Sequence, residues 1–267
     1  MTAEGGEFRD CDKFYRASMR LLEQAGIPFL VGGAYAFGSY TGISRDTKDF
    51  DIFVQSRDVE QALAALDKGG YRADRTFPHW LAKAHCGENV IDLIYRAGNG
   101  LCEVDQSWFD RACDGELLEI PVKLCAPEEI LWMKAFIMER ERYDGADVAH
   151  LIESCAEKID WEHLLQRFAA DWRLLLSHLI LFGYVFPSER DRVPARVMGE
   201  LLDRLGNDSG PESGRVCRGT MISRQQYLRD VQERGFIDAR LEDRVRMNQD
   251  DIARWTEAIS RDGSPTH

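Results

Sequence analysis

Apolar residues in the first half of the chain recur with two different periods, so short strands and helices alternate there. Apolar runs with two-residue alternation or continuous burial are typical of strands, whereas spacings of three and four are typical of amphipathic helices. The pattern predicts strands over 27–31, 49–54, 80–86 and 89–95, and helices over 8–25, 34–42 and 58–68. Gly87 and Glu88 alone separate the last two strands, which indicates a hairpin. Residues 116–124 add an edge strand, in which Pro121 marks the edge or a bulge.

The second half of the chain has a helical pattern throughout. It predicts helices over 127–142, 146–157, 161–168, 172–186 and 194–205. Residues 206–214 have the composition of a linker, and Ser223 with Gln226 forms a capping box that opens a last pair of helices. We therefore expect an α+β fold, in which a mixed sheet with flanking helices over 1–125 is followed by an α-helical region over 126–267, with a linker near 206–214.

Composition narrows the classes of partner. Among 267 residues, 34 are Lys or Arg and 46 are Asp or Glu, so the formal net charge is −12. Proteins that hold an extended nucleic-acid backbone normally carry a basic excess, so we expect no such binding here. No apolar run reaches the roughly 20 residues that span a bilayer, and the first residues are neither basic nor apolar. These features predict a cytoplasmic protein without a membrane partner.

The cysteines and histidines carry no recognisable metal signature. The 7 cysteines are scattered and form no C-x-x-C pair, so neither a zinc site nor a disulfide framework is indicated. The 6 histidines lack ligand spacings such as H-E-x-x-H. His79 and His85 flank a predicted strand, where either could line a binding site, although a surface or core position is the simpler interpretation.

Two aspartates stand on one face of a predicted strand. In the run D-F-D-I-F-V, Asp49 and Asp51 are two residues apart, so their side chains point to the same side at a spacing of roughly 6.6 Å. Asp is depleted in strands, and two on one face therefore need an explanation. Carboxylates at this spacing can converge on a pair of metal ions about 3.5–4 Å apart.

A third acid interrupts the apolar run V-I-D-L-I-Y. A carboxylate at Asp92 is unfavourable in such a strand unless it is paired or binds a metal. If this strand lies beside the first, Asp92 completes a triad with Asp49 and Asp51. Three carboxylates suit Mg²⁺, with Mn²⁺ as an alternative, because these hard ions prefer oxygen ligands. Each feature alone has a simpler structural explanation, and only their combination favours a metal site.

The ordered combination carries a family resemblance. The stretch V-G-G-A-Y-A-F-G-S-Y-T-G-I-S-R-D-T-K-D-F-D-I-F-V (31–54), followed by the later Asp92, resembles the DNA polymerase β-like nucleotidyltransferase superfamily. The resemblance implies the nucleotidyltransferase fold over 1–125. It implies Mg²⁺ on Asp49, Asp51 and Asp92, with Asp92 nearest the incoming hydroxyl and acting as its base.

The same resemblance implies phosphate contacts. The backbone amides of Gly32 and Gly33 would cradle the triphosphate, and Arg45, Thr47 or Lys48 could contact phosphates. Gly38-Ser39 also precedes the D-x-D run, at a spacing that another branch of the superfamily uses. Gly32-Gly33 is preferred because a convincing strand precedes it, and Gly38-Ser39 stays the alternative.

A second, downstream resemblance concerns the helical half. Lys134 followed by R-Y-D-G-A-D (142–147) is similar to uncharacterised nucleotidyltransferases and to the AbiEii toxin group, which has Lys followed by R-x-K-D-x-x-D. Tyr143 stands where the toxin group has Lys, which departs from the toxin pattern. Lys134 is either a phosphate contact or a solvated helix lysine. Asp144 and Asp147 are expected to cap or pair within the helical half.

The resemblance implies an enzyme that transfers an NMP from Mg-NTP to a hydroxyl of an unidentified acceptor and releases pyrophosphate. The acceptor could be a small molecule, an RNA end or a protein. A catalytically silent nucleotide-binding module of the same fold is one alternative, and a toxin-type nucleotidyltransferase acting on tRNA or protein is another. A metal-dependent phosphohydrolase using the same carboxylates is a third.

Overall fold

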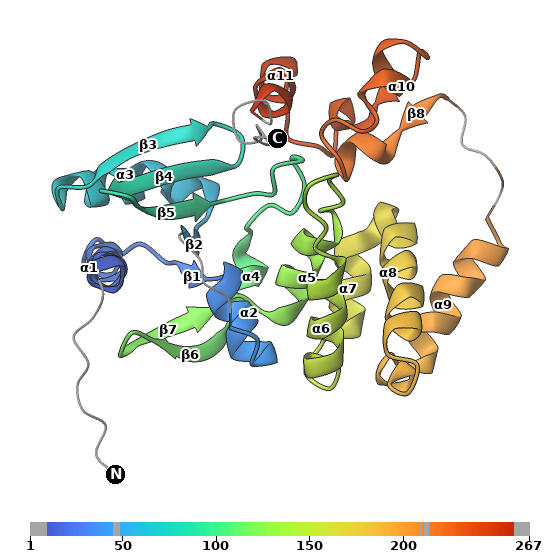
Figure 1. Ribbon diagram of the computed structural model, residues 1–267, viewed down its shortest axis with the longest axis horizontal. Helices are drawn as coiled ribbons and strands as arrows, with labels where there is room; N and C mark the ends of the chain where they lie inside the picture. Colours follow the sequence, from blue (N-terminus) through green and yellow to red (C-terminus); the bar gives the residue numbers. More distant parts are fainter. Residues whose placement is uncertain (1–9, 45–48, 209, 211–213, 259–267) are drawn as a thin grey trace, which may run out of the picture. The chain divides into compact units, whose positions relative to one another are not determined.

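The computed structural model describes residues 10–44, 49–208, 210 and 214–258. The chain divides into two compact units (Figure 1). The N-terminal unit comprises residues 1–39, 44–96 and 103–125. The C-terminal unit comprises residues 40–43, 97–102 and 126–267.

The N-terminal unit is built on a seven-stranded mixed sheet with strand order β3-β4-β5-β2-β1-β7-β6. Its elements are α1 (Asp10–Gln24), β1 (Leu30–Val31), α2 (Gly33–Thr41), β2 (Asp49–Phe53), η1 (Ser56–Asp58), α3 (Val59–Lys68), β3 (Arg72–Phe77), β4 (Leu81–Cys86), β5 (Asn89–Ile94), α4 (Gln106–Asp110), β6 (Cys113–Leu117) and β7 (Ile120–Leu124). Strand β2 pairs in parallel with β5 and antiparallel with β1. The expected α+β class with a mixed sheet and flanking helices is confirmed.

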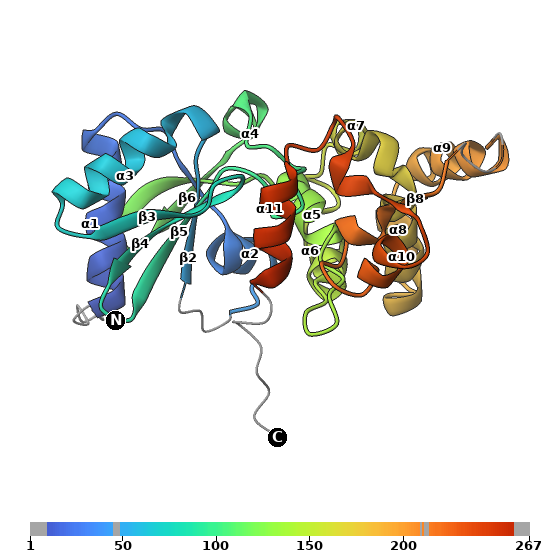
Figure 2. The ribbon, with the colours of Figure 1, turned by 90° about the horizontal axis from the view of Figure 1, so that it is seen from above.

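The two faces of this sheet differ in chemistry. Helices α1 and α3 lie side by side on one face (Figures 1 and 2), where they contact each other and strands β3, β4 and β5. Phe50 and Ile52 of β2 are fully buried, and the Tyr15 ring of α1 lies 4.8 Å from the Phe50 ring. Because side chains alternate along a strand, Asp49 and Asp51 point to the opposite face. The apolar face thus anchors the strand that presents the acids.

The C-terminal unit is helical, as the pattern predicts. Its elements are α5 (Pro127–Ala135), α6 (Gly145–Cys155), α7 (Trp161–Phe168), η2 (Ala169–Asp171), α8 (Trp172–Val185), η3 (Arg190–Arg192), α9 (Ala195–Gly206), β8 (Val216–Cys217), η4 (Arg218–Met221), α10 (Leu228–Gln232), β9 (Ile237–Asp238), η5 (Ala239–Leu241) and α11 (Gln249–Glu257). Helix α5 packs on α6 and α7, and α8 packs on α6 and α9. Strands β8 and β9 form a small parallel pair.

One helical segment of the C-terminal unit, residues 161–185, is long and apolar enough to cross a membrane by length and composition alone. In the structure it is two helices, α7 of 8 residues and α8 of 14 residues, separated by η2. Each is shorter than the roughly 20 residues that a spanning helix needs. Several of its apolar side chains are buried, including Leu164, Phe168 and Phe182.

Three local predictions are wrong. Helix α5 ends at Ala135 instead of continuing to 142, and the segment after it forms an isolated bridge between Met138 and Tyr143. Residues 116–124 are not one edge strand, because the chain turns at Leu118 and Glu119 between β6, which is the edge, and β7, which lies between β1 and β6. Pro121 itself is paired only with β6, because β1 is two residues long and pairs with β7 at Leu124 alone.

The third error concerns the last pair of helices. No helix begins at Ser223; its hydroxyl accepts from the Gln226 backbone amide, but α10 starts only at Leu228. The side chain of Ser223 also donates to Glu139, which ties it to a distant loop. A complete capping box opens α11 instead, between Asn248 and Asp251.

Candidate active site

The turn between β1 and α2 brings backbone against a carboxylate. Gly33 has φ of +52°, in the left-handed region that favours glycine. A Cβ built on Gly33 would lie 1.7 Å from Oδ2 of Asp51, so only glycine fits there. Gly38 and Ser39 lie inside α2, and the Ser39 hydroxyl donates to the Tyr35 carbonyl one turn earlier. The strand-to-helix turn is therefore at Gly32-Gly33.

The two glycines of this turn differ in what their amides do. The Gly32 N–H donates to the carbonyl oxygen of Asp51 at 3.0 Å and is thus part of the strand pairing. The first hydrogen bond of α2 runs from the Ala36 N–H to the Gly32 carbonyl. The amides at the start of a helix have no partner within that helix and form an anion-binding end. A phosphate cradle would therefore begin at Gly33 and not at Gly32.

The three predicted acids come together on adjacent strands. Strand β2 pairs with β5 so that Asp51 stands directly opposite Asp92, and Asp49 stands opposite Val90. Neighbouring strands are about 4.8 Å apart, and paired residues point to the same side of the sheet. Asp49, Asp51 and Asp92 thus share the face opposite α1 and α3. On the same face, Phe53 stacks on Trp108 of α4 with ring centres 5.4 Å apart.

Strand β4 adds a residue that sequence reasoning missed. Lys83 stands opposite Asp92, and its Nζ lies 2.8 Å from Asp92 Oδ1. Burial raises the pKa of the Asp92 carboxyl above its ordinary value; the Lys83 ammonium opposes this rise, and the negative charge of Asp49 adds to it. The two-residue hairpin loop at Gly87 and Glu88 fixes this register, so the pairing could have been read from the sequence.

The donor set suits a divalent cation, although it is not gathered into a ligand cage. Within the described parts of the chain, no three side chains among His, Cys, Asp and Glu are grouped so that they could hold a metal ion. Asp92 is engaged by Lys83, whereas Asp49 and Asp51 follow each other on one face of β2. Three carboxylates on two adjacent strands beside a glycine turn are nevertheless the oxygen-rich set that Mg²⁺ prefers.

Lys134 lies in the C-terminal unit and is held by carboxylates. Its Nζ lies 2.8 Å from Asp144 Oδ2 and 2.6 Å from Asp147 Oδ2, and Arg142 donates to both carboxylate oxygens of Asp144. The side chains of Lys134, Asp144 and Asp147 are 14%, 8% and 4% exposed, so this is a buried cluster and not a solvated helix lysine. Burial would raise the pKa of Asp144, but its hydrogen bonds from Arg142 and the charge of Lys134 lower it overall.

The remaining predicted contacts, Arg45, Thr47 and Lys48, lie outside the described residues. Of the two histidines near the acids, His79 is buried, with its ring 6.4 Å from that of Phe77. His85 lies on β4, with Nε2 3.8 Å from Asp74 of β3.

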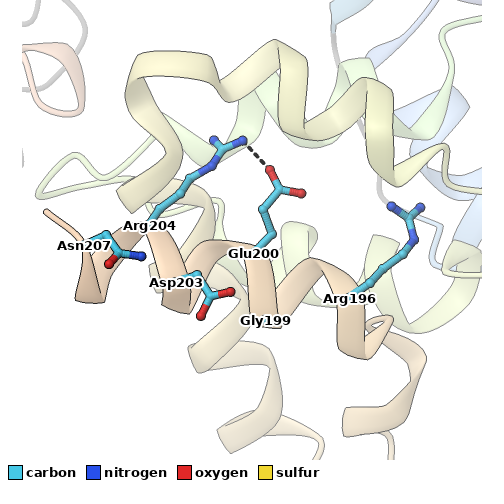
Figure 3. Close-up of a pocket in the computed structure, with 6 residues that line it drawn as sticks. All are labelled: Arg196, Gly199, Glu200, Asp203, Arg204 and Asn207. Atoms are coloured by element: carbon cyan, nitrogen blue, oxygen red, sulfur yellow. Dashed lines mark hydrogen bonds and ion pairs between the residues drawn. The ribbon is translucent and has the colours of Figure 1, made fainter.

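A hollow elsewhere in the structure has no relation to these residues. It is lined by helix α9 and its C-terminal cap, through Arg196, Gly199, Glu200, Asp203, Arg204 and Asn207 (Figure 3). Figure 3 shows that Arg204 and Glu200, one turn apart, point toward each other and form an ion pair. This hollow is a charged surface of a single helix and carries none of the predicted site residues.

If the turn and Asp51 serve the nucleotide chemistry that the resemblance implies, Gly33→Ala should lower that activity by about a hundredfold, because displacing a reacting group by 1 Å has effects of that size. The new methyl group must push the Asp51 carboxylate away, and the left-handed backbone adds strain of about 1–2 kcal/mol. Gly26→Ala is the matched control, since Gly26 has φ of +68° and nothing within 4 Å of its added Cβ. Gly26→Ala should lose only the stability that the left-handed backbone costs, whereas Gly33→Ala should lose more because its methyl group also meets Asp51, and only Gly33→Ala should lose activity. Equal activity of the two would contradict this role of the turn.

Comparison with solved structures finds several similar proteins at low sequence identity. Among solved structures, the antibiotic-resistance factor ANT(2'')-Ia is 16% identical, with 62% of this chain and 95% of that chain covered and a TM-score of 0.42. The lincosamide antibiotic adenylyltransferase LnuA, in its lincomycin-bound structure, is 13% identical, with 55% and 98% covered and a TM-score of 0.38. An antigenic nucleotidyltransferase-like protein from Paracoccidioides brasiliensis is 16% identical, with 70% and 94% covered and a TM-score of 0.41.

No curated protein matches the sequence. The family described as uncharacterised nucleotidyltransferase matches residues 17–185, which is more than half of the chain and includes the glycine turn and all three aspartates. The resemblance read from the sequence is confirmed, and the chain belongs to this nucleotidyltransferase family.

Proposed function

We propose that the protein transfers a nucleoside monophosphate from an NTP to a hydroxyl group of an acceptor and releases pyrophosphate. One observation carries this proposal: Gly33, at the N-terminus of α2, lies against the Asp51 carboxylate, and Asp51 stands opposite Asp92. A phosphate-binding helix end and a set of carboxylates therefore adjoin each other in one unit. Nucleotidyl transfer needs both, one for the triphosphate and one for its cation.

The carboxylates would hold Mg²⁺, with Mn²⁺ as an alternative ion. Asp49 and Asp51 are two residues apart on one face of β2, and Asp92 faces them from β5. When bound, Mg²⁺ would neutralise phosphate charge and polarise the phosphoryl oxygens. The three aspartates orient the ion, and burial of Asp92 keeps that carboxylate away from bulk water.

The amides that open α2 would bind the triphosphate. Helix N-termini attract anions through unpaired N–H groups and the helix dipole. Gly33 permits the backbone to approach closely, and the Gly32 N–H holds the turn on β2. Arg45, Thr47, Lys48 and Lys134 are proposed as further phosphate contacts on the strength of the family motif alone.

Asp92 is proposed as the base for the acceptor hydroxyl. The hydroxyl oxygen forms a bond to the α-phosphorus while the bond from that phosphorus to the bridging oxygen of the β-phosphate breaks. The hydroxyl proton passes to the Asp92 carboxylate, and pyrophosphate leaves with the bonding electron pair. Catalysis then consists of positioning and charge stabilisation, which are the main sources of rate in phosphoryl transfer.

A specific observation favours a second function. The Lys83 ammonium already neutralises Asp92, as would suit a fold that binds nucleotide without transferring it. Such a module would keep the glycine turn and lose only the chemistry. Pyrophosphate release on incubation with an NTP and candidate acceptors separates the two functions, and release of orthophosphate instead would indicate a phosphohydrolase.

Calorimetric titration with ATP, GTP, CTP and UTP tests the proposal directly. With Mg²⁺ present, the wild-type protein should bind one or more of these nucleotides. Asp49→Asn/Asp51→Asn should bind at least about a hundredfold more weakly, because the cation that accompanies the phosphates loses two ligands. Asp114→Asn is the control; Asp114 is an exposed acid of β6 paired with Lys123, and its variant should bind like wild type.

The same titration without a divalent ion should show weak or no binding. Binding that is equally strong without metal, or that survives in Asp49→Asn/Asp51→Asn, would contradict the metal-nucleotide site. The localisation in the cytoplasm and the absence of a membrane partner stay predictions from the sequence.

A further inference from the structure

Lys83 lies in a partly buried part of the acidic face. It lies on β4 directly opposite Asp92, and Nζ is 2.8 Å from Asp92 Oδ1. The two side chains are only 25% and 14% exposed. Of the described lysines that pair across neighbouring strands, Lys123 makes a similar contact of 2.7 Å with Asp114, but those side chains are 56% and 90% exposed.

Electrostatics explains this partly buried pair. A largely buried carboxylate needs a cationic partner, because burial without one is strongly unfavourable. A divalent cation on Asp92 would meet that need as well as the ammonium does. Two cations on one carboxylate repel each other, and this repulsion is weakly screened away from bulk water. The ammonium and the metal therefore compete for Asp92.

A second carboxylate lies on the other side of Lys83. Asp74 of β3 stands opposite Lys83 in the strand register, so Asp92, Lys83 and Asp74 form one row across three strands. Directly opposed residues of an antiparallel pair have Cβ atoms about 4.5–5.5 Å apart. The ammonium thus has an acidic neighbour that can receive it when it leaves Asp92.

We propose that Lys83 is a positioning residue whose ammonium acts as a placeholder for the metal at Asp92. The metal displaces the ammonium when it binds, and this competition sets the metal affinity of the site. The inference rests on the proposed function, since it takes Asp92 to be a metal ligand. In the metal-free protein, the ammonium neutralises Asp92 and keeps its carboxylate in place. On loading, the ammonium turns toward Asp74 and the cation takes its position at Asp92.

A titration of the 267-residue chain with Mn²⁺, without nucleotide, tests this. Electron paramagnetic resonance measures the concentration of the free ion. Lys83→Met keeps the length of the side chain and removes its charge. It should bind Mn²⁺ about tenfold more tightly than wild type, within the range by which groups around a metal site tune affinity. Lys83→Met/Asp92→Asn should lose the gain, because the contested carboxylate is gone. Lys123→Met is the matched control and should bind Mn²⁺ like wild type.

Unfolding in urea gives a second measurement. Without metal, Lys83→Met should unfold at lower urea than wild type, because Asp92 has lost its partner. Saturating Mn²⁺ should raise its midpoint by more than it raises that of wild type. Lys83→Gln, which is also uncharged but can still donate a hydrogen bond to Asp92, replaces Lys83→Met if the latter does not fold.

The outcomes separate this inference from the proposed function. Binding of Mn²⁺ by wild type and not by Asp49→Asn/Asp51→Asn supports the metal site. If Lys83→Met then binds Mn²⁺ no more tightly than wild type, the placeholder role is wrong and the metal site stands. If neither wild type nor Lys83→Met binds Mn²⁺, both the metal site and the placeholder role are wrong.

Discussion

Asp51→Asn should lower the rate of nucleotidyl transfer by about a hundredfold to a thousandfold. Asp51 adjoins both parts of the site, since its carboxylate touches the Gly33 turn and its position faces Asp92. Asparagine keeps the shape but removes the charge that would hold the cation. A metal ion supplies several kcal/mol of transition-state stabilisation, and loss of about 3–4 kcal/mol corresponds to this change in rate. Pyrophosphate release under single-turnover conditions measures it.

The control for this variant is Asp114→Asn, which removes an acid of the same sheet whose partner is Lys123 at the surface. Its rate should equal that of wild type. Urea unfolding of Asp51→Asn shows whether the protein is folded, so that a lost rate can be attributed to the site. A folded Asp51→Asn variant that retains more than about a tenth of the wild-type rate would exclude Asp51 as a metal ligand.

Lys134→Met should destabilise the protein by about 3–5 kcal/mol, the range observed when one partner of a buried ion pair is removed. The ammonium is shared by Asp144 and Asp147, which are both buried, and neither can easily reach water when it is gone. The free energy of unfolding in urea measures the loss. Lys123→Met, which breaks an exposed pair, should change stability by less than about 1 kcal/mol.

The pH dependence of stability provides an independent check on this cluster. The pKa of Asp144 is lower in the folded protein than in the unfolded chain. As pH falls through the ordinary pKa of an aspartate, the unfolded chain therefore takes up a proton at Asp144 before the folded protein does. The stabilisation that Asp144 contributes is therefore present above that value and is lost toward acid. In Lys134→Met this acid-induced loss should be smaller. An unchanged unfolding free energy would show that Lys134 is dispensable to the fold and would favour a purely nucleotide-binding role.

The acid-bearing strands could be predicted because their patterns are local. Strands β2 and β5 have continuous apolar character that the aspartates interrupt, and a two-residue loop joins β4 to β5. Strand β3 was missed because its sequence, R-A-D-R-T-F, is mostly polar and its side chains are largely exposed at the sheet edge. Such a strand is defined by its neighbour, and its own residues give little sign of it.

The end of α5 depends on contacts that local sequence does not contain. Residues 136–142 have the composition of a continuing helix, yet Glu139 accepts hydrogen bonds from Ser223 and from Arg224, about 85 positions further along the chain. The Asp144 N–H bonds to the Ile137 carbonyl and closes the loop. Tertiary contacts override helix propensity here. The same loop presents the buried Lys134 cluster, which explains why Lys134 could not be assigned from its motif.

The parallel pairing of β2 with β5 also bears on how the family can vary. Asp51 and Asp92 are separated by 40 intervening positions, yet main-chain hydrogen bonds between two neighbouring strands set their spacing. The connection between those strands, which contains α3, β3 and β4, can lengthen or change composition without shifting either carboxylate. Relatives can therefore differ in this connecting segment, and so in the residues that surround the acids, while the backbone pairing keeps the distance between the acids fixed.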